Sequence, residues 1–246
     1  MTLAQKVGHA RRLLGIAEKN HSPAAFASSF GAEDMVVLDL IARDGLAISI
    51  FTLDTGRLPR ATHDLVGRVR REYGLAIHEY APWPESVDAY VDQHGIDGFY
   101  DGVEQRKACC AIRKVEPLRR ALAGKRAWVT GLRRGQAESR AMLQEIERDP
   151  VHNLWKYNPL VDWTHDEVWE YLRANKIPYN ALHDRGYPSI GCEPCTRAVK
   201  PGEHPRAGRW WWEQDTAKEC GIHCSVELAG SQSDREKADA GAEGGV

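Results

Sequence analysis

Strand-like and helix-like segments alternate along the first half of the chain, and this alternation constrains the fold more than any other feature. Residues 24–30 and 46–51 are short apolar runs typical of buried strands. Residues 33–44 lie between them and residues 58–74 follow them, both with helical periodicity. Strands that alternate with helices predict βαβ units, which build a parallel sheet with crossover helices.

Later segments extend the pattern. Residues 75–80 and 126–131 are predicted strands, and residues 113–124 are a predicted helix. Thr164 and Glu167 match a capping box, which predicts that another helix begins there. We therefore expect an open, mostly parallel α/β sheet with helices on both faces.

Composition divides the chain into three expected parts. Residues 1–200 should form the α/β domain, and residues 201–228 a flexible C-terminal segment that carries two cysteines. Residues 229–246 are polar, small and aperiodic, so we expect a disordered tail there.

Charge and hydropathy argue against two kinds of partner. Lys and Arg number 33 against 35 Asp and Glu, so the formal charge of −2 does not imply bulk nucleic-acid binding. No apolar run approaches the roughly 20 residues of a membrane span. The amphipathic residues 1–20 lack the apolar centre of a secretory signal. The sequence predicts a cytoplasmic protein that binds neither nucleic acid nor membrane. Its oligomeric state, a homo-oligomer included, stays open.

Two loops follow consecutive predicted strands, where an open α/β sheet binds its ligands. In the first loop, Ser28, Ser29 and Gly31 precede a helix N-terminus, an arrangement suited to a phosphate or sulfate. In the second loop, Asp54 or the backbone is a candidate partner for a ribose or base. Either loop alone could be an ordinary turn, but together they favour a nucleotide site.

Four of the six cysteines form two closely spaced pairs. Cys109 and Cys110 are adjacent, which does not suit a disulfide between them because the ring would be strained. Cys192 and Cys195 form a C-x-x-C, a spacing that chelates a metal or forms a redox dithiol. Four thiolates are the usual ligand set of an iron–sulfur cluster.

Zinc also takes four cysteines, but two adjacent ligands on one zinc ion would be cramped. A 4Fe–4S cube offers separate irons to neighbouring thiolates. Two alternatives stay open: a pair of buried free thiols, or a redox C-x-x-C beside which Cys109 and Cys110 are bystanders.

Basic residues flank the adjacent cysteines, and they would stabilise an anionic cluster or face an anionic substrate. They are Arg106, Lys107, Arg113 and Lys114. Further along, Cys220 lies beside a glycine with cations nearby and is a candidate nucleophile. Arg206 and Arg209 precede it and suit an oxyanion clamp.

Seven motifs occur together and in order: SSFGAED, LDTG, KACCAIRKVEPL, TGLRRGQAESR, GCEPCTR, GRWWWE and KECGIH. In this combination, residues 20–223 resemble the assimilatory adenylyl-sulfate reductases, the cluster-containing branch of the phosphoadenylyl-sulfate reductase family. The resemblance implies an adenine nucleotide alpha hydrolase-like fold, in which the first loop is a modified pyrophosphate loop.

The resemblance also implies a site. One 4Fe–4S cluster would be bound by the two cysteine pairs, with Cys220 as the nucleophile. Substrate contacts would come from the two loops named above and from Gly131, Arg140, Lys114, Arg206 and Arg209. Cys224 departs from the family pattern, which leaves open whether Cys220 forms an internal disulfide.

The implied reaction belongs to sulfate assimilation, upstream of cysteine biosynthesis. Cys220 would attack the sulfur of adenosine 5′-phosphosulfate and release AMP, and reduced thioredoxin would then release sulfite from an S-sulfocysteine. One competing interpretation is 3′-phosphoadenylyl sulfate as substrate, which relatives without the cluster cysteines prefer. Another is a tRNA-thiolating pyrophosphate-loop enzyme, which the charge of −2 supports little. The third is a nucleotide-binding iron–sulfur sensor, which would not need Cys220.

Overall fold

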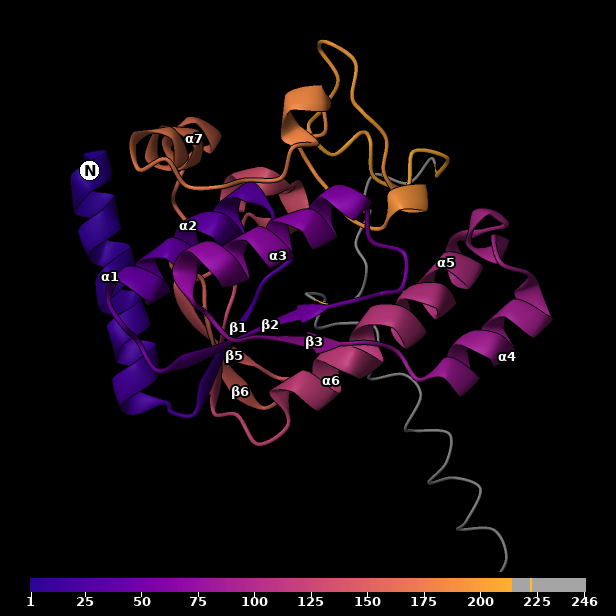
Figure 1. The fold of residues 1–246 in the computed structure, drawn as a ribbon, viewed down its shortest axis with the longest axis horizontal. Coiled ribbons are helices and arrows are strands. Elements are labelled where there is room, and N and C mark those ends of the chain that lie inside the picture. The colour runs from indigo at the N-terminus through magenta and orange to yellow at the C-terminus, as the bar shows by residue number, and fades with distance from the viewer. Residues whose placement is uncertain (214–221, 223–246) are drawn as a thin grey trace, which may run out of the picture.

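A computed structural model describes residues 1–213 and residue 222. Its centre is a six-stranded sheet in the order β3-β2-β1-β4-β6-β5 (Figure 1). Every neighbouring pair of strands is parallel except β5 and β6, which are antiparallel. The strands are β1 Ala24–Ala27, β2 Ile48–Leu53, β3 Ile77–Tyr80, β4 Ala127–Val129, β5 Ile146–Asp149 and β6 Leu154–Tyr157.

Helices cover both faces of this sheet, which confirms the predicted fold class (Figure 1). α1, α2, α3 and α7 pack on one face, and α6 packs on the other. The helices are α1 Leu3–Asn20, α2 Ala32–Arg43, α3 Arg60–Tyr73, α4 Pro84–His94, α5 Val103–Cys110, α6 Glu116–Leu122 and α7 His165–Ala174.

The strands supply both cores because successive side chains point to opposite faces of a sheet. In β1, Ala24 and Phe26 belong to the larger core under α2, whereas Ala25 belongs to the smaller core under α6. A strand buried on both faces reads as a continuous apolar run rather than an alternating one. This explains why the apolar runs of the first half predict the strands well.

Local signals set several helix ends. Thr164 caps α7 through the predicted capping box with Glu167. α3 ends at Gly74, which adopts the left-handed conformation (φ 64°) that glycine tolerates without steric cost. α2 begins after Gly31 and carries Glu33 and Asp34 in its first turn, where the helix dipole favours negative charge.

The structure differs from the sequence prediction at three places. The helix predicted over residues 113–124 is the end of a longer helical run, in which a π-helical turn over Ala111–Val115 joins α5 to α6. α4 was not predicted, because Tyr90 is the one residue that this helix buries and an apolar stripe is missing. β5 and β6 were not predicted either, since charged residues such as Arg148 and Lys156 interrupt them.

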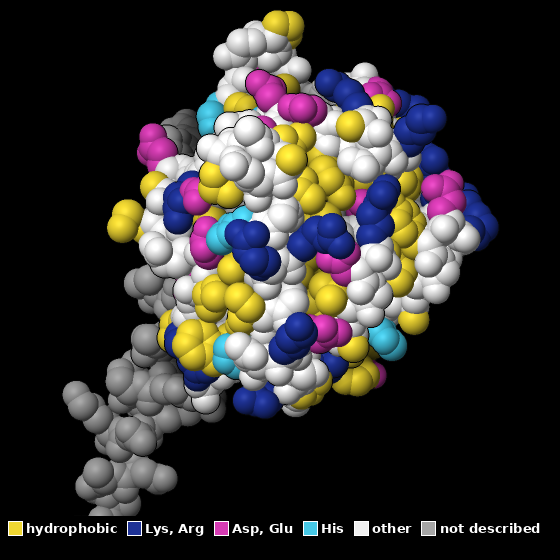
Figure 2. All heavy atoms as spheres, turned by 90° about the vertical axis from the view of Figure 1, so that its left-hand side faces the viewer, with side chains coloured by type: hydrophobic (Ala, Val, Ile, Leu, Met, Phe, Trp, Pro, Cys, Tyr) yellow, Lys and Arg dark blue, Asp and Glu magenta, His cyan; other side chains and the backbone are white. Residues whose placement is uncertain are grey.

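No helix in the described part of the chain has the length and apolarity needed to cross a membrane. On the face around α1, Lys and Arg side chains are interspersed with Asp and Glu (Figure 2). This face therefore lacks the continuous basic surface that RNA-binding proteins present. The predicted tail over residues 229–246 lies outside the described residues and stays a prediction.

Candidate active site

The loop between β1 and α2 is held in an uncommon backbone conformation. Phe30 has a φ of 59° and is fully buried, and its N–H donates to the Ser28 hydroxyl at 3.2 Å. A bulky residue in the left-handed region costs free energy, and such residues concentrate at functional sites. The turn aims the loop at the N-terminus of α2, where unsatisfied backbone N–H groups attract an anion.

Asp34 ties this loop together from inside α2. Its Oδ2 atom accepts hydrogen bonds from the Ser29 backbone N–H at 2.6 Å and from the Ser29 hydroxyl at 2.7 Å. Burial raises the pKa of Asp34 to about 6, although the bonds from Ser29 act in the opposite direction. The carboxyl group is therefore charged at neutral pH but easier to protonate than an exposed aspartate.

The segment after β4 lies against the start of α2. A Cβ atom on Gly131 would come within 2.2 Å of Asp34 Oδ1, so only glycine fits this close approach. Two residues later, the Arg133 guanidinium bonds to Glu33 Oε1 through Nε at 2.9 Å and Nη2 at 2.7 Å. Burial favours the neutral Glu33, but the charge and bonds of Arg133 outweigh it and lower the Glu33 pKa.

These two segments border an open cavity at the carboxyl ends of β1, β2 and β4. It lies where an open α/β sheet places its ligands. The predicted site residues that line it are Ser28, Ser29, Gly31, Lys114, Gly131, Arg140, Arg206 and Arg209.

Asp54 is the one described candidate that does not line this cavity. Its neighbours Leu53 and Thr55 line the cavity instead. The Asp54 carboxylate accepts a hydrogen bond from the Gly56 N–H at 2.9 Å, and its ligand atom lies within 4.8 Å of those of His63 and Glu79. The second loop therefore borders the cavity through Leu53 and Thr55, and the role predicted for Asp54 stays a prediction.

Several lining residues were not singled out from the sequence. Thr55 is part of the quoted LDTG motif and is 1% exposed. Arg133 belongs to the quoted TGLRRG motif, and it organises Glu33 as described above. His183 had no such signal, because it lies in an irregular segment far from the motifs of the loops.

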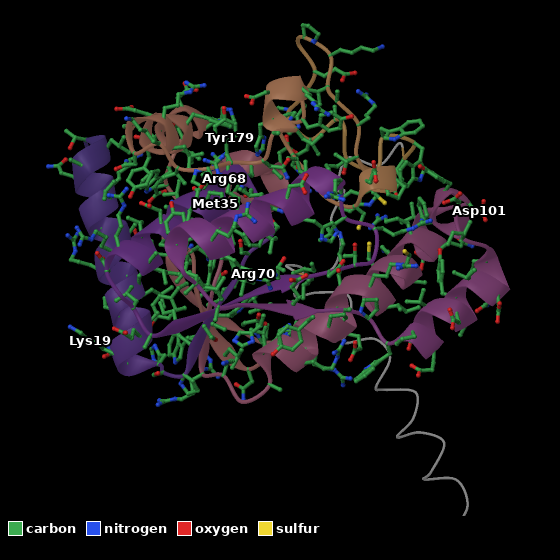
Figure 3. All side chains as sticks on the ribbon, viewed as in Figure 1. Lys19, Met35, Arg68, Arg70, Asp101 and Tyr179 are labelled. Atoms are coloured by element: carbon green, nitrogen blue, oxygen red, sulfur yellow. The ribbon has the colours of Figure 1, made fainter. Side chains whose placement is uncertain are left out.

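The four paired cysteines meet at a second, smaller cavity. Cys109, Cys110, Cys192 and Cys195 all line it, and each is buried as a free thiol. Figure 3 shows sulfur atoms gathered between α5 and the segment drawn in orange, which comes from the last part of the described chain. The fold thus brings together two pairs that lie some eighty residues apart in the sequence.

The adjacent cysteines end α5 where the helical geometry changes. The next five residues, Ala111–Val115, form a π-helical turn, and Pro117 follows in the first turn of α6. Proline has no N–H to donate and its ring crowds the carbonyl four residues earlier, so a regular α-helix is disfavoured across this junction. π-helical turns of this kind occur often at functional sites.

The spacing of the four sulfur atoms tests which metal they suit. Tetrahedral zinc with bonds of about 2.3 Å would hold its sulfur ligands about 3.8 Å apart. Among the described residues, however, no three of these sulfurs lie within 4.8 Å of one another. Three sulfurs of a tetrahedral zinc site would lie closer together than this.

Cations surround the smaller cavity, which suits an anionic centre. Arg57, Arg106, Arg113 and Lys114 line it with the cysteines. Arg113 donates from Nη1 to the Thr55 carbonyl at 2.8 Å. The Nη1 atom of Arg57 is buried and has no hydrogen-bond acceptor among the described residues. A bound anionic group would satisfy this donor.

The surroundings of Cys192 favour ionisation of its thiol. Burial opposes ionisation, but Lys114, the Thr55 hydroxyl and Arg209 outweigh it, so the pKa of Cys192 falls below its ordinary value. Thr55 Oγ1 lies 3.3 Å from the Cys192 sulfur. By contrast, burial raises the pKa of Cys195 to about 12 in the metal-free chain. An added positive centre would be needed to ionise all four thiols together.

The two cavities share residues. Lys114 and Cys192 line both of them, and Lys114 is only 9% exposed. A cation buried between a metal centre and a ligand cavity acts on both, because burial strengthens electrostatic interactions. The substrate contact predicted for Lys114 stays a prediction.

Arg209 joins the last described segment to the same cavity. Its Nη1 atom donates to the Ile190 carbonyl at 2.9 Å, while its Nε atom is buried and has no acceptor among the described residues. The guanidinium packs against Gly191, and a Cβ atom at that position would displace it. Ile222 also lines the cavity, but the predicted nucleophile Cys220 and Cys224 lie outside the described residues.

Comparisons with known proteins agree with this geometry. Residues 23–198 match the phosphoadenosine phosphosulfate reductase domain. A protein of Allochromatium vinosum named adenosine 5′-phosphosulfate reductase is 53% identical over 222 residues, which cover 90% of this chain and 87% of the relative. One of the same name from Burkholderia cepacia is 54% identical and covers 91% and 90%.

Among solved structures, the phosphoadenylyl-sulfate reductase of Candida auris, crystallised with phosphate, aligns with a TM-score of 0.67 at 28% identity. The alignment covers 80% of this chain and 96% of that one. The sequence and the fold point to one group of proteins. The chain belongs to the phosphoadenosine phosphosulfate reductase family.

Proposed function

We propose that this protein reduces adenosine 5′-phosphosulfate to sulfite and AMP, with reduced thioredoxin as the electron donor. The observation that carries this proposal is the sharing of Lys114 and Cys192 between the cavity at the strand ends and the four-cysteine cavity. The names of relatives about 50% identical over most of the chain support the same substrate.

The cavity residues suit the two ends of this substrate. The N-terminus of α2 and the hydroxyls of Ser28 and Ser29 offer donors to a phosphate or ribose oxygen. Lys114 and Arg209 offer positive charge to the sulfate, and Arg206 and Arg140 line the same cavity. Donors fixed before the reaction stabilise charge that develops on the leaving AMP without reorganising.

Two thiol displacements account for the chemistry. The Cys220 thiolate attacks the sulfur of the substrate, an S–S bond forms, and the S–O bond to AMP breaks. A thioredoxin thiolate then attacks the Cys220 sulfur and releases sulfite, which leaves a mixed disulfide. The second thioredoxin thiol resolves this disulfide and restores Cys220. The net change oxidises one dithiol and reduces the sulfate group by two electrons.

The two cysteine pairs would hold a 4Fe–4S cluster, because four buried thiols with cations around them match its ligand set and its charge. When bound, the cluster supplies fixed charge and rigidity beside Lys114. Every bond change above involves Cys220, the substrate or thioredoxin.

Similarity to named relatives favours the substrate without a 3′-phosphate. Relatives about 50% identical over most of the chain are named adenosine 5′-phosphosulfate reductase, whereas the Candida auris phosphoadenylyl-sulfate reductase is 28% identical. We therefore expect adenosine 5′-phosphosulfate to be preferred over its 3′-phosphorylated form.

The test is sulfite release by anaerobically purified protein supplied with adenosine 5′-phosphosulfate and reduced thioredoxin. Cys220→Ser should abolish sulfite release, because the first displacement needs this thiolate, and should keep the brown colour of the iron centre. Cys224→Ser is the matched control and should keep most of the activity.

Two outcomes would contradict the proposal. The first is a larger kcat/KM for the 3′-phosphorylated nucleotide, which would show that the substrate is wrong. The second is an active Cys220→Ser variant, which would show that the nucleophile is wrong. Peptide mass spectrometry after mixing with substrate, without reductant, should locate a sulfonate adduct on Cys220.

A further inference from the structure

Three side chains outside both cavities bring metal-ligating atoms to one point. The ligand atoms of Asp54, His63 and Glu79 all lie within 4.8 Å of one another. None of these three residues lines either of the two cavities described above. Asp54 is also the predicted site residue that the larger cavity leaves aside, so the role of its carboxylate is not taken up by the substrate site.

The strand pattern places the two carboxylates on one face of the sheet. Ile50 of β2 and Ile77 of β3 belong to the core under α3, and side chains two residues apart in a strand point to the same face. Glu79 follows Ile77 by two residues, and Asp54 follows Ile50 by four at the end of β2. Both carboxylates therefore continue the face that α3 covers.

Helix α3 supplies the third ligand. His63 lies near its N-terminus, and Arg70 follows two turns later on the same side of the helix. Within the described chain, the His63 ring makes no hydrogen bond, ion pair or ring contact. A neutral imidazole is a common ligand of divalent transition metals. An imidazole without a partner, within reach of two carboxylates, distinguishes this cluster from an acidic patch.

Neighbouring groups already orient both carboxylates. The Gly56 N–H donates to Asp54 Oδ1 at 2.9 Å, and Arg70 Nη2 lies 2.7 Å from Glu79 Oε1. Arg70 also donates to the Ile77 carbonyl at 2.6 Å, which fixes the guanidinium. The other oxygen of each carboxylate has no hydrogen bond within the described residues. Metal ligands are commonly oriented in this way, by groups that do not bind the ion themselves.

The ligand types select a class of ion. Carboxylates alone suit Mg²⁺ and Ca²⁺, whereas an added imidazole shifts the preference toward divalent transition ions such as Mn²⁺, Fe²⁺ and Zn²⁺. Ligands on opposite sides of one such ion, with bonds of about 2.1 Å, lie about 4.2 Å apart, and neighbouring ligands lie closer. Small side-chain rotations would therefore bring the three ligand atoms from their present separations, within 4.8 Å, onto one ion.

We propose that Asp54, His63 and Glu79 form a binding site for one divalent transition metal ion, with water in the remaining coordination positions. The ion joins the ends of β2 and β3 to the start of α3. The four paired cysteines take no part in this site, and the proposal does not depend on the reaction that the protein catalyses.

The experiment titrates the full-length protein, purified anaerobically, with Mn²⁺. Thiolates bind this ion poorly, so the cysteines do not compete for it. Electron paramagnetic resonance of the free aqueous ion measures how much is bound. We expect one saturable equivalent with a Kd of about 0.1 mM, as for an exposed site with few charged ligands. An equal concentration of Mg²⁺ should displace little of it, because the imidazole favours the transition ion.

Removing any one ligand should weaken Mn²⁺ binding by about tenfold or more, since loss of even an orienting group has an effect of this size. The variants are Asp54→Asn, His63→Ala and Glu79→Gln. Asp64→Asn is the matched control, because Asp64 follows His63 on α3 but pairs with Arg60 outside the cluster. It should bind Mn²⁺ like the unchanged protein.

Absence of a saturable equivalent would overturn the proposal. Unchanged binding by His63→Ala, or equal displacement by Mg²⁺, would also overturn it, because the ion would then bind to carboxylates alone. Equal weakening in Asp64→Asn would show a diffuse effect of surface charge instead of a site. Circular dichroism checks that each variant folds. Should Asp54→Asn not fold, the exposed positions His63 and Glu79 still decide the outcome. Absence of sulfite release would leave every one of these results intact.

Discussion

Asp34 combines two properties at the scale of a single residue. It fastens the first loop by accepting two bonds from Ser29, yet its burial works against its charge. The loop is therefore held by a carboxylate whose ionised form is costly in the folded chain. The free-energy cost of ionising the buried carboxyl depends on pH. The pH dependence of the free energy of unfolding therefore measures this cost.

Replacing Asp34 with Asn should remove a pH dependence from the stability. The unchanged carboxyl has a pKa near 3.8 when exposed and about 6 when folded, so it stabilises the folded state fully below pH 4 and loses this contribution as pH rises through 6. The stability of Asp34→Asn relative to the unchanged protein should rise by roughly 3 kcal/mol between pH 4 and pH 7. Urea unfolding of both metal-free, reduced proteins measures this difference. An equal pH dependence of the free energy of unfolding in the two proteins would contradict this expectation.

At the scale of elements, the sequence predicts only part of the helical run from α5 to α6. The helix over residues 113–124 was predicted, but the π-helical turn before it was not. Hydrophobic periodicity is similar in α and π geometry over five residues, so a pattern cannot separate them. The signal that was present is Pro117, which disfavours a regular helix across this junction.

Deleting Ala111 should test what the π-helical turn does. A π turn contains one residue more than the α turn it replaces, so the deletion should restore a regular helix and rotate α5 by about 100° relative to α6. Cys109 and Cys110 would then leave the cavity. We expect iron content to fall to background while far-UV circular dichroism stays similar.

Ala111→Ser is the matched control, because it keeps the chain length at the same exposed position. It should bind iron like the unchanged protein. A brown, iron-loaded deletion variant would show that the turn does not set the direction of the two cysteines.

At the scale of the whole molecule, the sequence predicts the sheet and the grouping of the cysteines better than the direction of single side chains. Apolar runs reveal β1, β2 and β4 because these strands are buried on both faces. β5 lies at the edge of the sheet, where polar residues are tolerated, so its sequence lacks the apolar run that predicts a buried strand. Asp54 was expected at the cavity, but the turn after β2 directs its neighbours there instead.

Metal removal should lower the stability of the entire fold. The four cysteines come from α5 and from a loop near residue 195, so a metal bound between them joins distant parts of the chain. Such binding stabilises only the folded state. We expect the midpoint of thermal unfolding to fall by roughly 5–10 °C on stripping, equivalent to about 3 kcal/mol for a chain of this size. Cys192→Ser should show no further loss on the same treatment, and an unchanged midpoint for the original protein would refute the expectation.

The separation of the cysteine pairs also governs how the protein is made. On the ribosome, α5 emerges with Cys109 and Cys110 well before β4, β5, β6 and the loop that carries Cys192 and Cys195. Chains fold progressively from their N-terminal side during synthesis, so the first thiol pair waits while the sheet is completed. The proposed iron centre could therefore assemble only after both pairs have been made, late in synthesis. Overproduction with too little iron would then yield folded protein whose four thiols are free.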